Sequence, residues 1–457
     1  MATALQFGDE LTAMEPQEAA ASRYMARLVF ASFWTIVFTG AVRKWIAPGV
    51  TALYLLQDIP IGLAYIYALY TGLFTRGYMM LGIMLLTAVL TLQGLLQIIV
   101  SGLSPVVAFI GLHNYLFYLP MLLIFSWAFT KKYRTDYIRW NLLLSLPMCL
   151  LAVVQAQAPK SAWINKSSSG DAFGVPGADV ARVTGTFNFT AFYGIWVATA
   201  VALCVGEWLL PKESRAIKST WLLLTCTFAV NVCHLISASR GAVALAVTSI
   251  LGGVVAAFIL RSYRALFMIG GLALLLPVGA AATYALSPSE FNIMTERFTR
   301  ANEVDSTKTR LMDGVIGFIT IPDFSLIGAG VGMGVDAAHV DSTDSNSFTY
   351  ALSEIDVIRN VMELGTPVGL LYVLTRIGFL VGMILFAVYL VRNGSSPHVL
   401  PLAFFLFAQA YAGDVTRNGT MTASQIMLGY SFILGVYYHP DNRETDSAAI
   451  DSPTRYA

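Results

Sequence analysis

The chain has 457 residues, of which 56% are hydrophobic and only 12% charged, and 28 basic and 27 acidic side chains leave a net charge of +1. Soluble domains carry about a quarter charged residues, so this composition, with a mean hydropathy of +0.67, excludes an ordinary soluble protein. The net charge indicates nothing about partners. We expect membrane lipids among them and no nucleic acid.

Apolar segments close to the about 20 residues that cross a bilayer recur along most of the chain. We therefore predict an all-α, polytopic membrane protein with about 12 transmembrane helices and one large, mostly helical external loop. The polar, acidic start of the chain predicts no cleaved signal peptide, so the first span would be an uncleaved anchor. The predicted spans cover residues 28–47, 51–74, 78–100, 105–129, 139–157, 187–210, 219–237, 242–260, 265–286, 365–391, 398–413 and 420–438.

Basic residues collect in alternate short loops, and such loops are usually cytoplasmic. Both termini are therefore predicted to be cytoplasmic, with the outer face formed by loops 158–186 and 287–363 and the turn at 237–241. The predicted parts are an N-terminal tail (1–27), a bundle of about nine spans (28–286), a large external loop (287–363), about three further spans (364–438) and a C-terminal tail (439–457).

Seven arginines lie at or near the predicted outer face despite the bias of the charge rule against them. They are Arg182, Arg240, Arg297, Arg300, Arg310, Arg359 and Arg417. Guanidinium suits phosphate because its planar fork gives two hydrogen bonds and keeps its charge. The cluster predicts an anion site, and the alternative is simple pairing with Asp or Glu. For Arg182 a second alternative is an interfacial anchor, whereas Arg240 lies in a very short turn where charge is costly.

The large loop carries most of the remaining polar chemistry. Helices are expected near 288–301 and 306–321, followed by the glycine-rich segment Gly328–Gly334, which predicts a flexible loop of close approach. A third helix is predicted to begin with Ser353 as N-cap, which places Asp356, Arg359, Asn360 and Glu363 on one face. Arg359 and Glu363 could form an (i, i+4) ion pair.

Metal and thiol chemistry are not favoured. His339 with Asp341 and Asp344 is a possible metal cluster, but the surrounding Ser and Thr residues are typical of a solvated loop. The four cysteines lie in apolar runs without zinc-type spacing. We expect neither a metal nor a cofactor.

The layout resembles the O-antigen ligase and polymerase superfamily of bacterial enzymes. The features that carry the resemblance are the number of spans, the segment Arg182–Phe187, the turn Ser239–Gly241 and the late outer loop. In that loop an arginine-bearing helix (Arg310), a glycine loop and Glu363-Leu-Gly-Thr-Pro-Val-Gly369 follow one another, with the last glycine one place later than in the family pattern. Residues 40–45 and 53–58 also look like the polysaccharide-polymerase branch.

The resemblance implies a site and a reaction. It implies an inverting, metal-independent glycosyltransferase of the bacterial inner membrane that joins undecaprenyl-pyrophosphate-linked oligosaccharide repeats, with other polysaccharide-assembly proteins as possible partners. Glu354 occupies the position where family ligases carry His, which favours a polymerase with Glu354 as general base. Pyrophosphate contacts are expected from Arg240, Arg310, Arg359 and Arg182, with Glu363 and His339 in support. The alternatives are an O-antigen ligase, a lipid-linked oligosaccharide flippase or transporter, and a non-catalytic scaffold for a polysaccharide-assembly complex.

Overall fold

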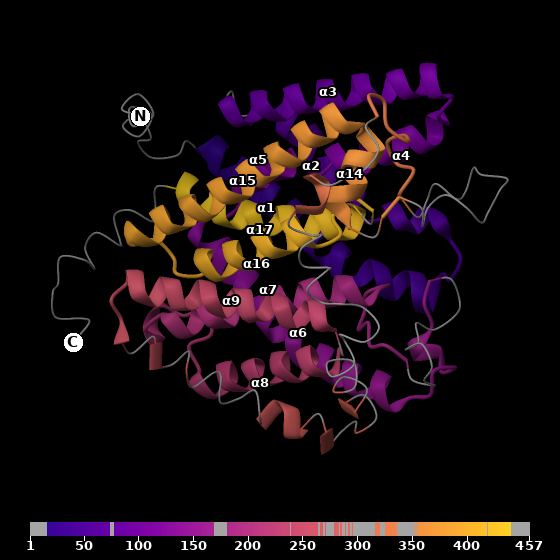
Figure 1. Cartoon of the computed structure of the whole chain (residues 1–457). Coiled ribbons are helices and arrows are strands. Elements are labelled where there is room, and N and C mark those ends of the chain that lie inside the picture. The colour runs from indigo at the N-terminus through magenta and orange to yellow at the C-terminus, as the bar shows by residue number, and fades with distance from the viewer. Residues whose placement is uncertain are drawn as a thin grey trace.

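The structure is a computed structural model, and all of its described regular secondary structure is helical (Figure 1). The described residues are 16–73, 77–168, 181–237, 239–263, short stretches between 266 and 295, 316–319, 325–335, 352–353, 355–417 and 419–439. The predicted all-α class is confirmed for this part of the chain.

Apolar runs form long helices because a helix satisfies its own backbone groups where water is absent. Local signals set several boundaries: Gly102 ends α3 with φ +67°, and the side chains of Ser219 and Ser239 cap α8 and α9. The α-helices are α1 (Pro16–Ala41), α2 (Asp58–Tyr70), α3 (Tyr78–Ser101), α4 (Pro105–Leu116), α5 (Met121–Ser126), α6 (Lys131–Gln157), α7 (Thr190–Leu209), α8 (Thr220–Ile236), α9 (Arg240–Ile259), α14 (Asp356–Leu364), α15 (Thr366–Arg392), α16 (Val399–Ala412) and α17 (Gly419–Tyr438).

Short helical turns of other kinds connect these helices. The chain leaves α1 through one π-helical turn, η3 (Val42–Ile46). The 3₁₀ turns are η4 (Thr51–Leu55), η5 (Trp163–Asn165), η6 (Lys212–Ser214) and η7 (Gly317–Ile319).

Seven helices in the described residues are long and apolar enough to cross a membrane. They cover Ser22–Ile46, Tyr78–Ser101, Pro105–Ser126, Lys131–Gln157, Thr190–Leu209, Arg240–Ile259 and Thr366–Arg392. The predicted count of about 12 is not confirmed. The segments near 51–74, 219–237 and 398–413 form helices of 13, 17 and 14 residues, which reach only about 20–26 Å against a hydrocarbon core of about 30 Å. Most of 265–286 lies outside the described residues.

The core of the bundle is built around α7, most of whose side chains are buried. It packs against α9 and α16, and glycines allow these helices close approach. A Cβ on Gly252 of α9 would lie 2.6 Å from the carbonyl oxygen of Leu400 in α16, and one on Gly206 of α7 would lie 2.3 Å from the ring of His398. Large substitutions at these two glycines would therefore separate the central helices.

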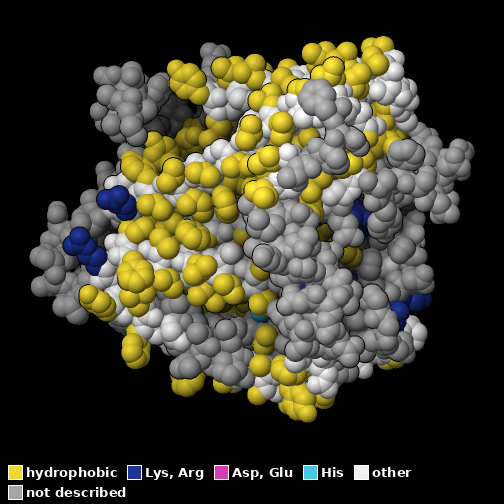
Figure 2. Space-filling model, in the orientation of Figure 1, with side chains coloured by type: hydrophobic (Ala, Val, Ile, Leu, Met, Phe, Trp, Pro, Cys, Tyr) yellow, Lys and Arg dark blue, Asp and Glu magenta, His cyan; other side chains and the backbone are white. Residues whose placement is uncertain are grey.

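The outward faces of α3 and α15 are apolar, as a lipid-facing surface requires. Met84, Leu85 and Ile99 of α3 and Leu374 and Leu385 of α15 are all more than half exposed. Figure 2 shows hydrophobic side chains spread over this face, with the visible basic side chains towards its two ends. An apolar surface of this extent in a soluble monomer would be unusual.

The candidate site lies towards one end of the bundle. In Figure 1, α1 begins and α17 ends at the left, whereas α14 lies towards the right. The starts of α7 and α9 pack together, since a Cβ on Gly194 would lie 3.4 Å from Cβ of Ala242. Which side of a membrane each end faces stays a prediction.

Candidate functional site

Helix α14 presents a buried polar face, as its spacing predicts. Asp356, Arg359, Asn360 and Glu363 are each at most 2% exposed. The helix begins at Asp356 with Ile355 as N-cap, so the prediction of Ser353 as N-cap is wrong. Ser353 has φ +111°, and its Oγ accepts a hydrogen bond from the backbone N–H of Ile355 (3.1 Å) before the helix begins.

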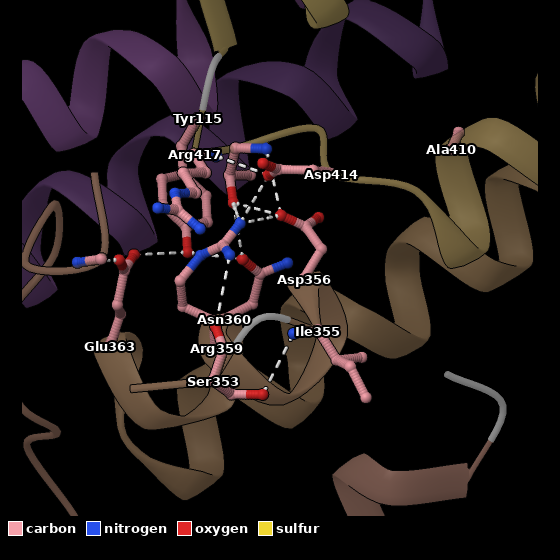
Figure 3. Close-up of polar contacts among 12 residues, drawn as sticks. Tyr115, Ser353, Ile355, Asp356, Arg359, Asn360, Glu363, Ala410, Asp414 and Arg417 are labelled. Atoms are coloured by element: carbon pink, nitrogen blue, oxygen red, sulfur yellow. Dashed lines mark hydrogen bonds and ion pairs between the residues drawn. The ribbon is translucent and has the colours of Figure 1, made fainter. Parts of the chain in front are cut away.

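Asp356 is the centre of an ionic network that joins three elements (Figure 3). Its Oδ1 accepts from Nη2 of Arg359 and from the N–H (3.1 Å) and hydroxyl (2.8 Å) of Thr416, and its Oδ2 accepts from Nη1 of Arg376. Burial opposes ionisation, but Arg376 and Arg359 hold the pKa of Asp356 well below its usual range. The network thus fixes α14 to α15 and to the α16–α17 connection.

Arg359 is committed to carboxylates. Its Nη2 lies 2.7 Å from Oδ1 of Asp414 as well as against Asp356, and its side chain is 1% exposed. The (i, i+4) pair with Glu363 is not formed as a hydrogen-bonded contact. Direct contact between Arg359 and a pyrophosphate would therefore require Asp414 to move, and the geometry favours a positioning role for Arg359.

Asp414 is the more accessible carboxylate of the network, with a side chain 32% exposed against 1% for Asp356. Burial raises its pKa, Arg359 lowers it in part and Asp356 raises it further, which gives a pKa of about 6. Asp414 therefore titrates closer to neutrality than an ordinary aspartate.

The carboxylate of Glu363 accepts a second set of hydrogen bonds beside the network around Asp356. Its Oε1 accepts from the N–H of Gly334 (2.7 Å), and its Oε2 accepts from the hydroxyl of Tyr115 (2.8 Å) and, at 3.5 Å, from the N–H of Gly332. Burial raises the pKa of Glu363, although Arg359, Tyr115 and both N–H groups oppose this.

Hydroxyl protons shared between acceptors link the contacts of Glu363 to those of Asp356. Tyr115 has one hydroxyl proton and two acceptors in reach, Oε2 of Glu363 and Oδ1 of Asn360 (2.7 Å). The hydroxyl of Thr416 likewise lies 2.9 Å from Oδ1 of Asn360. When the hydroxyl of Tyr115 donates to an ionised Glu363, the hydroxyl of Thr416 can donate to Asn360, and the backbone N–H of Thr416 still donates to Asp356. The protonation of Glu363 is thus coupled to the hydroxyl orientations around it.

The glycine segment 325–335 lies directly over α14 and α4. Gly332 has φ +90°, and a Cβ there would lie 2.4 Å from the carbonyl oxygen of Val107. A Cβ on Gly334 would lie 2.2 Å from Cδ of Arg359. The predicted close approach is confirmed, and only glycine fits at these two positions.

Two glutamines of α3 hold this segment and the end of α14 together. The Nε2 of Gln97 donates to the carbonyls of Ile327 (2.6 Å) and Glu363 (2.7 Å), and its Oε1 accepts from the N–H of Val331 (2.7 Å). Gln93 donates to the carbonyls of Ile327 and Leu364. The backbone carrying Glu363 is therefore fixed by hydrogen bonds from a helix far away in the sequence.

Arg240 is the first residue of α9, and no hydrogen bond or ion pair to the rest of the described chain engages its half-buried side chain. The N-terminus of a helix attracts anions. Ser239 caps the N–H of Ala242 (3.3 Å), while the neighbouring Gly241 is exposed and a Cβ there would meet nothing closer than 3.8 Å. Within the described residues, this helix end therefore carries a positive charge without an acidic partner and leaves room beside Gly241.

Arg182 is half-buried on the segment that leads into α7. Gly185 has φ +56°, so the chain turns here in a conformation that favours glycine. Gln155 of α6 fixes this turn, because its Oε1 accepts from the N–H of Gly185 (2.8 Å) and its Nε2 donates to the carbonyl of the same residue (3.1 Å).

Three predicted site residues, Glu354, Arg310 and His339, lie outside the described residues, so their roles stay predictions. The sequence interpretation did not identify Tyr115, Gln97 or Arg376 as part of the site. For Arg376 a signal existed, because a charge inside an apolar run usually has a partner or a function. Tyr115 and Gln97 carried no comparable signal in an apolar helix.

Among the described residues no group of three or more His, Cys, Asp or Glu side chains is placed to hold a metal ion. The four cysteines, which belong to this part of the chain, are free thiols. No protein-family model matches the chain, and no curated protein matches it.

Proposed function

We propose that this chain is an inverting, metal-independent glycosyltransferase that joins lipid-pyrophosphate-linked oligosaccharides into a surface polysaccharide. The observation that carries the proposal is Arg240 at the N-terminus of α9, which no hydrogen bond or ion pair within the described residues engages, in an otherwise apolar bundle. A charge kept near hydrocarbon without a partner among the described residues is well matched by an anion from outside the chain. A lipid pyrophosphate supplies that partner together with a tail that suits the apolar flanks.

The proposed reaction exchanges one bond at the anomeric carbon. An acceptor hydroxyl on a second lipid-linked repeat forms the new carbon–oxygen bond as the bond to pyrophosphate breaks, with inversion. Its proton passes to Glu354, and the lipid pyrophosphate leaves as an anion whose developing charge Arg240, Arg310 and Arg182 stabilise. Arg359 instead positions Asp356 and Asp414, in keeping with its burial.

The fixed site between α14, α4 and segment 325–335 supports an enzyme over a scaffold. Glu363, Tyr115 and Gly334 form buried contacts that hold one backbone arrangement, and rigid positioning of reacting groups is what group transfer needs. A ligase of the same chemistry, with another acceptor, is the close alternative.

One observation favours transport as a second candidate. Asp58 of α2 lies 3.2 Å from Nε2 of His113 in α4, and both side chains are at most 15% exposed. Paired ionisable groups within a membrane bundle also mark transport pathways. A flippase of the same lipid-linked sugar would use such a pair for coupling.

One experiment separates these functions. The purified full-length chain in proteoliposomes is given a lipid-linked oligosaccharide, and products are resolved by length. A ladder supports the polymerase and a single transfer supports the ligase. Flipping of a fluorescent lipid-linked sugar without any transfer would refute the enzyme and support transport.

A further inference from the structure

The π-helical turn η3 at the end of α1 carries a second group of cations, Arg43 and Lys44. Single π turns are rare and are frequent at functional sites. No carboxylate of the described chain pairs with either cation. Lys44 is only 2% exposed, so it does not reach water as an interfacial anchor does.

Lys44 fixes this turn to the segment before α7. Its Nζ donates to Oγ1 of Thr184 (3.0 Å) and to the carbonyl of Gly185 (2.6 Å), both neutral acceptors. Gly40 of α1 lies so close to this segment that a Cβ would be 2.3 Å from the carbonyl oxygen of Thr186. The amine of Lys44 is therefore held in place by neutral acceptors only.

Arg43 is held beside it with unused donors. With the amide of Asn188 oriented to satisfy both of its ends, Nη1 of Arg43 donates to that amide oxygen (2.8 Å), and the guanidinium lies 5.4 Å from the ring centre of Tyr54. Nε of Arg43 and Nε1 of Trp45 are buried and have no hydrogen-bond partner in the described chain. Buried donors are almost always paired.

These observations define the chemistry of the missing partner. The Arg43 guanidinium, the amine of Lys44 and two unpaired N–H donors lie within one turn, and no carboxylate of the described residues pairs with either basic side chain. A ligand that satisfies them must carry several acceptors, negative charge and no donor, which describes a phosphate-type oxyanion. We propose that η3 and the segment 184–188 form a binding site for the pyrophosphate group of a carrier lipid.

The proposal rests on the proposed function for the identity of the lipid, but not for the oxyanion. The segment 184–188 leads into α7, whose start packs against the start of α9, so η3 and Arg240 lie at the same end of the bundle. A lipid headgroup at this end could therefore be contacted by both.

The test is binding of inorganic pyrophosphate to the purified full-length chain, measured by isothermal titration calorimetry. Arg43→Gln keeps a donor for Asn188 and removes the charge, and we expect affinity to fall by about tenfold or more. Arg43→Lys should recover it only in part, because an ammonium lacks the fork. Arg392→Gln, an exposed arginine at the far end of α15, is the charge-matched control and should bind as the wild type does.

A second experiment tests whether the bound oxyanion belongs to a polyprenyl pyrophosphate or to an ordinary anionic lipid. Native mass spectrometry in nanodiscs compares a polyprenyl pyrophosphate with phosphatidylglycerol at equal mole fraction. Preferential retention of the pyrophosphate lipid, lost in Arg43→Gln, supports the proposal. Equal retention of both lipids would show a general anionic-lipid contact and overturn it.

The outcomes also separate this inference from the proposed function. Unchanged pyrophosphate affinity in a folded Arg43→Gln protein overturns the inference even if the wild type polymerises. Loss of affinity in that variant supports the oxyanion site even if no glycosyl transfer is found. Trp45→Phe, which removes only the unpaired N–H, should weaken binding less than Arg43→Gln does.

Discussion

Replacement of Glu363 tests whether the contacts around α14 are structural. In Glu363→Ala the N–H of Gly334 loses its acceptor at 2.7 Å, and an unsatisfied buried donor costs about 1–3 kcal/mol. One buried methylene, Cγ, is also lost, at about 0.8 kcal/mol. The hydroxyl of Tyr115 keeps Asn360 as an acceptor, so its lost contact with Glu363 adds little to the destabilisation. The expected loss in the free energy of unfolding is about 2–4 kcal/mol.

Glu363→Gln should cost much less. Its amide oxygen can face Gly334, and its amide nitrogen can donate to Tyr115, which then donates to Asn360. What is lost is the difference between a charged and a neutral hydrogen bond, about 1 kcal/mol. Glu213, an exposed glutamate, provides the control Glu213→Gln, expected to change stability by less than about 0.5 kcal/mol.

The assay is thermal unfolding in one detergent, combined with hydrogen exchange of the amides in 325–335. Glu363→Ala should lower the unfolding temperature most and accelerate exchange at Gly334, with Glu363→Gln intermediate. If Glu363→Ala matches Glu213→Gln in both measurements, Glu363 does not hold this segment and the reasoning is refuted.

Four further predictions concern the Arg240 charge, the titration of Asp414, the role of Glu354 as base, and the topology. Arg240→Ala should abolish glycosyl transfer in a folded protein and Arg240→Lys should restore it poorly; full turnover by the alanine variant would exclude the pyrophosphate contact. The pKa of Asp414 in the folded protein is raised to about 6. The stability that protonated Asp414 contributes is therefore lost as the pH rises from about 4 to 6. Over that interval the unfolding temperature of the wild type should fall relative to that of Asp414→Asn, and parallel curves for the two proteins would contradict the raised pKa. Glu354→Gln should lower turnover about 10²–10⁴-fold with little effect on donor binding. An impermeant thiol reagent on intact spheroplasts should label a cysteine at Ser342 and not one at Ser214; the reverse pattern would invert the topology.

The sequence determined the class of this protein and the face of its key helix. A chain with 12% charged residues and repeated long apolar runs has to form helices that bury their backbone groups, and α3, α7, α9 and α15 lie close to the predicted spans. The 3.6-residue period also placed Asp356, Arg359, Asn360 and Glu363 on one side of α14, and the structure buries that side.

Only the tertiary structure decided which partners those side chains take. Spacing rules compare residues three or four apart, and they suggested Arg359 with Glu363. Packing instead places Asp414, 55 residues away, on Arg359, and Tyr115, 248 residues away, on Glu363. Such pairs depend on how helices meet, which a local pattern does not contain. The same holds for Lys44 and Gly185, 141 residues apart: the π turn and the segment before α7 become one site only when the bundle closes.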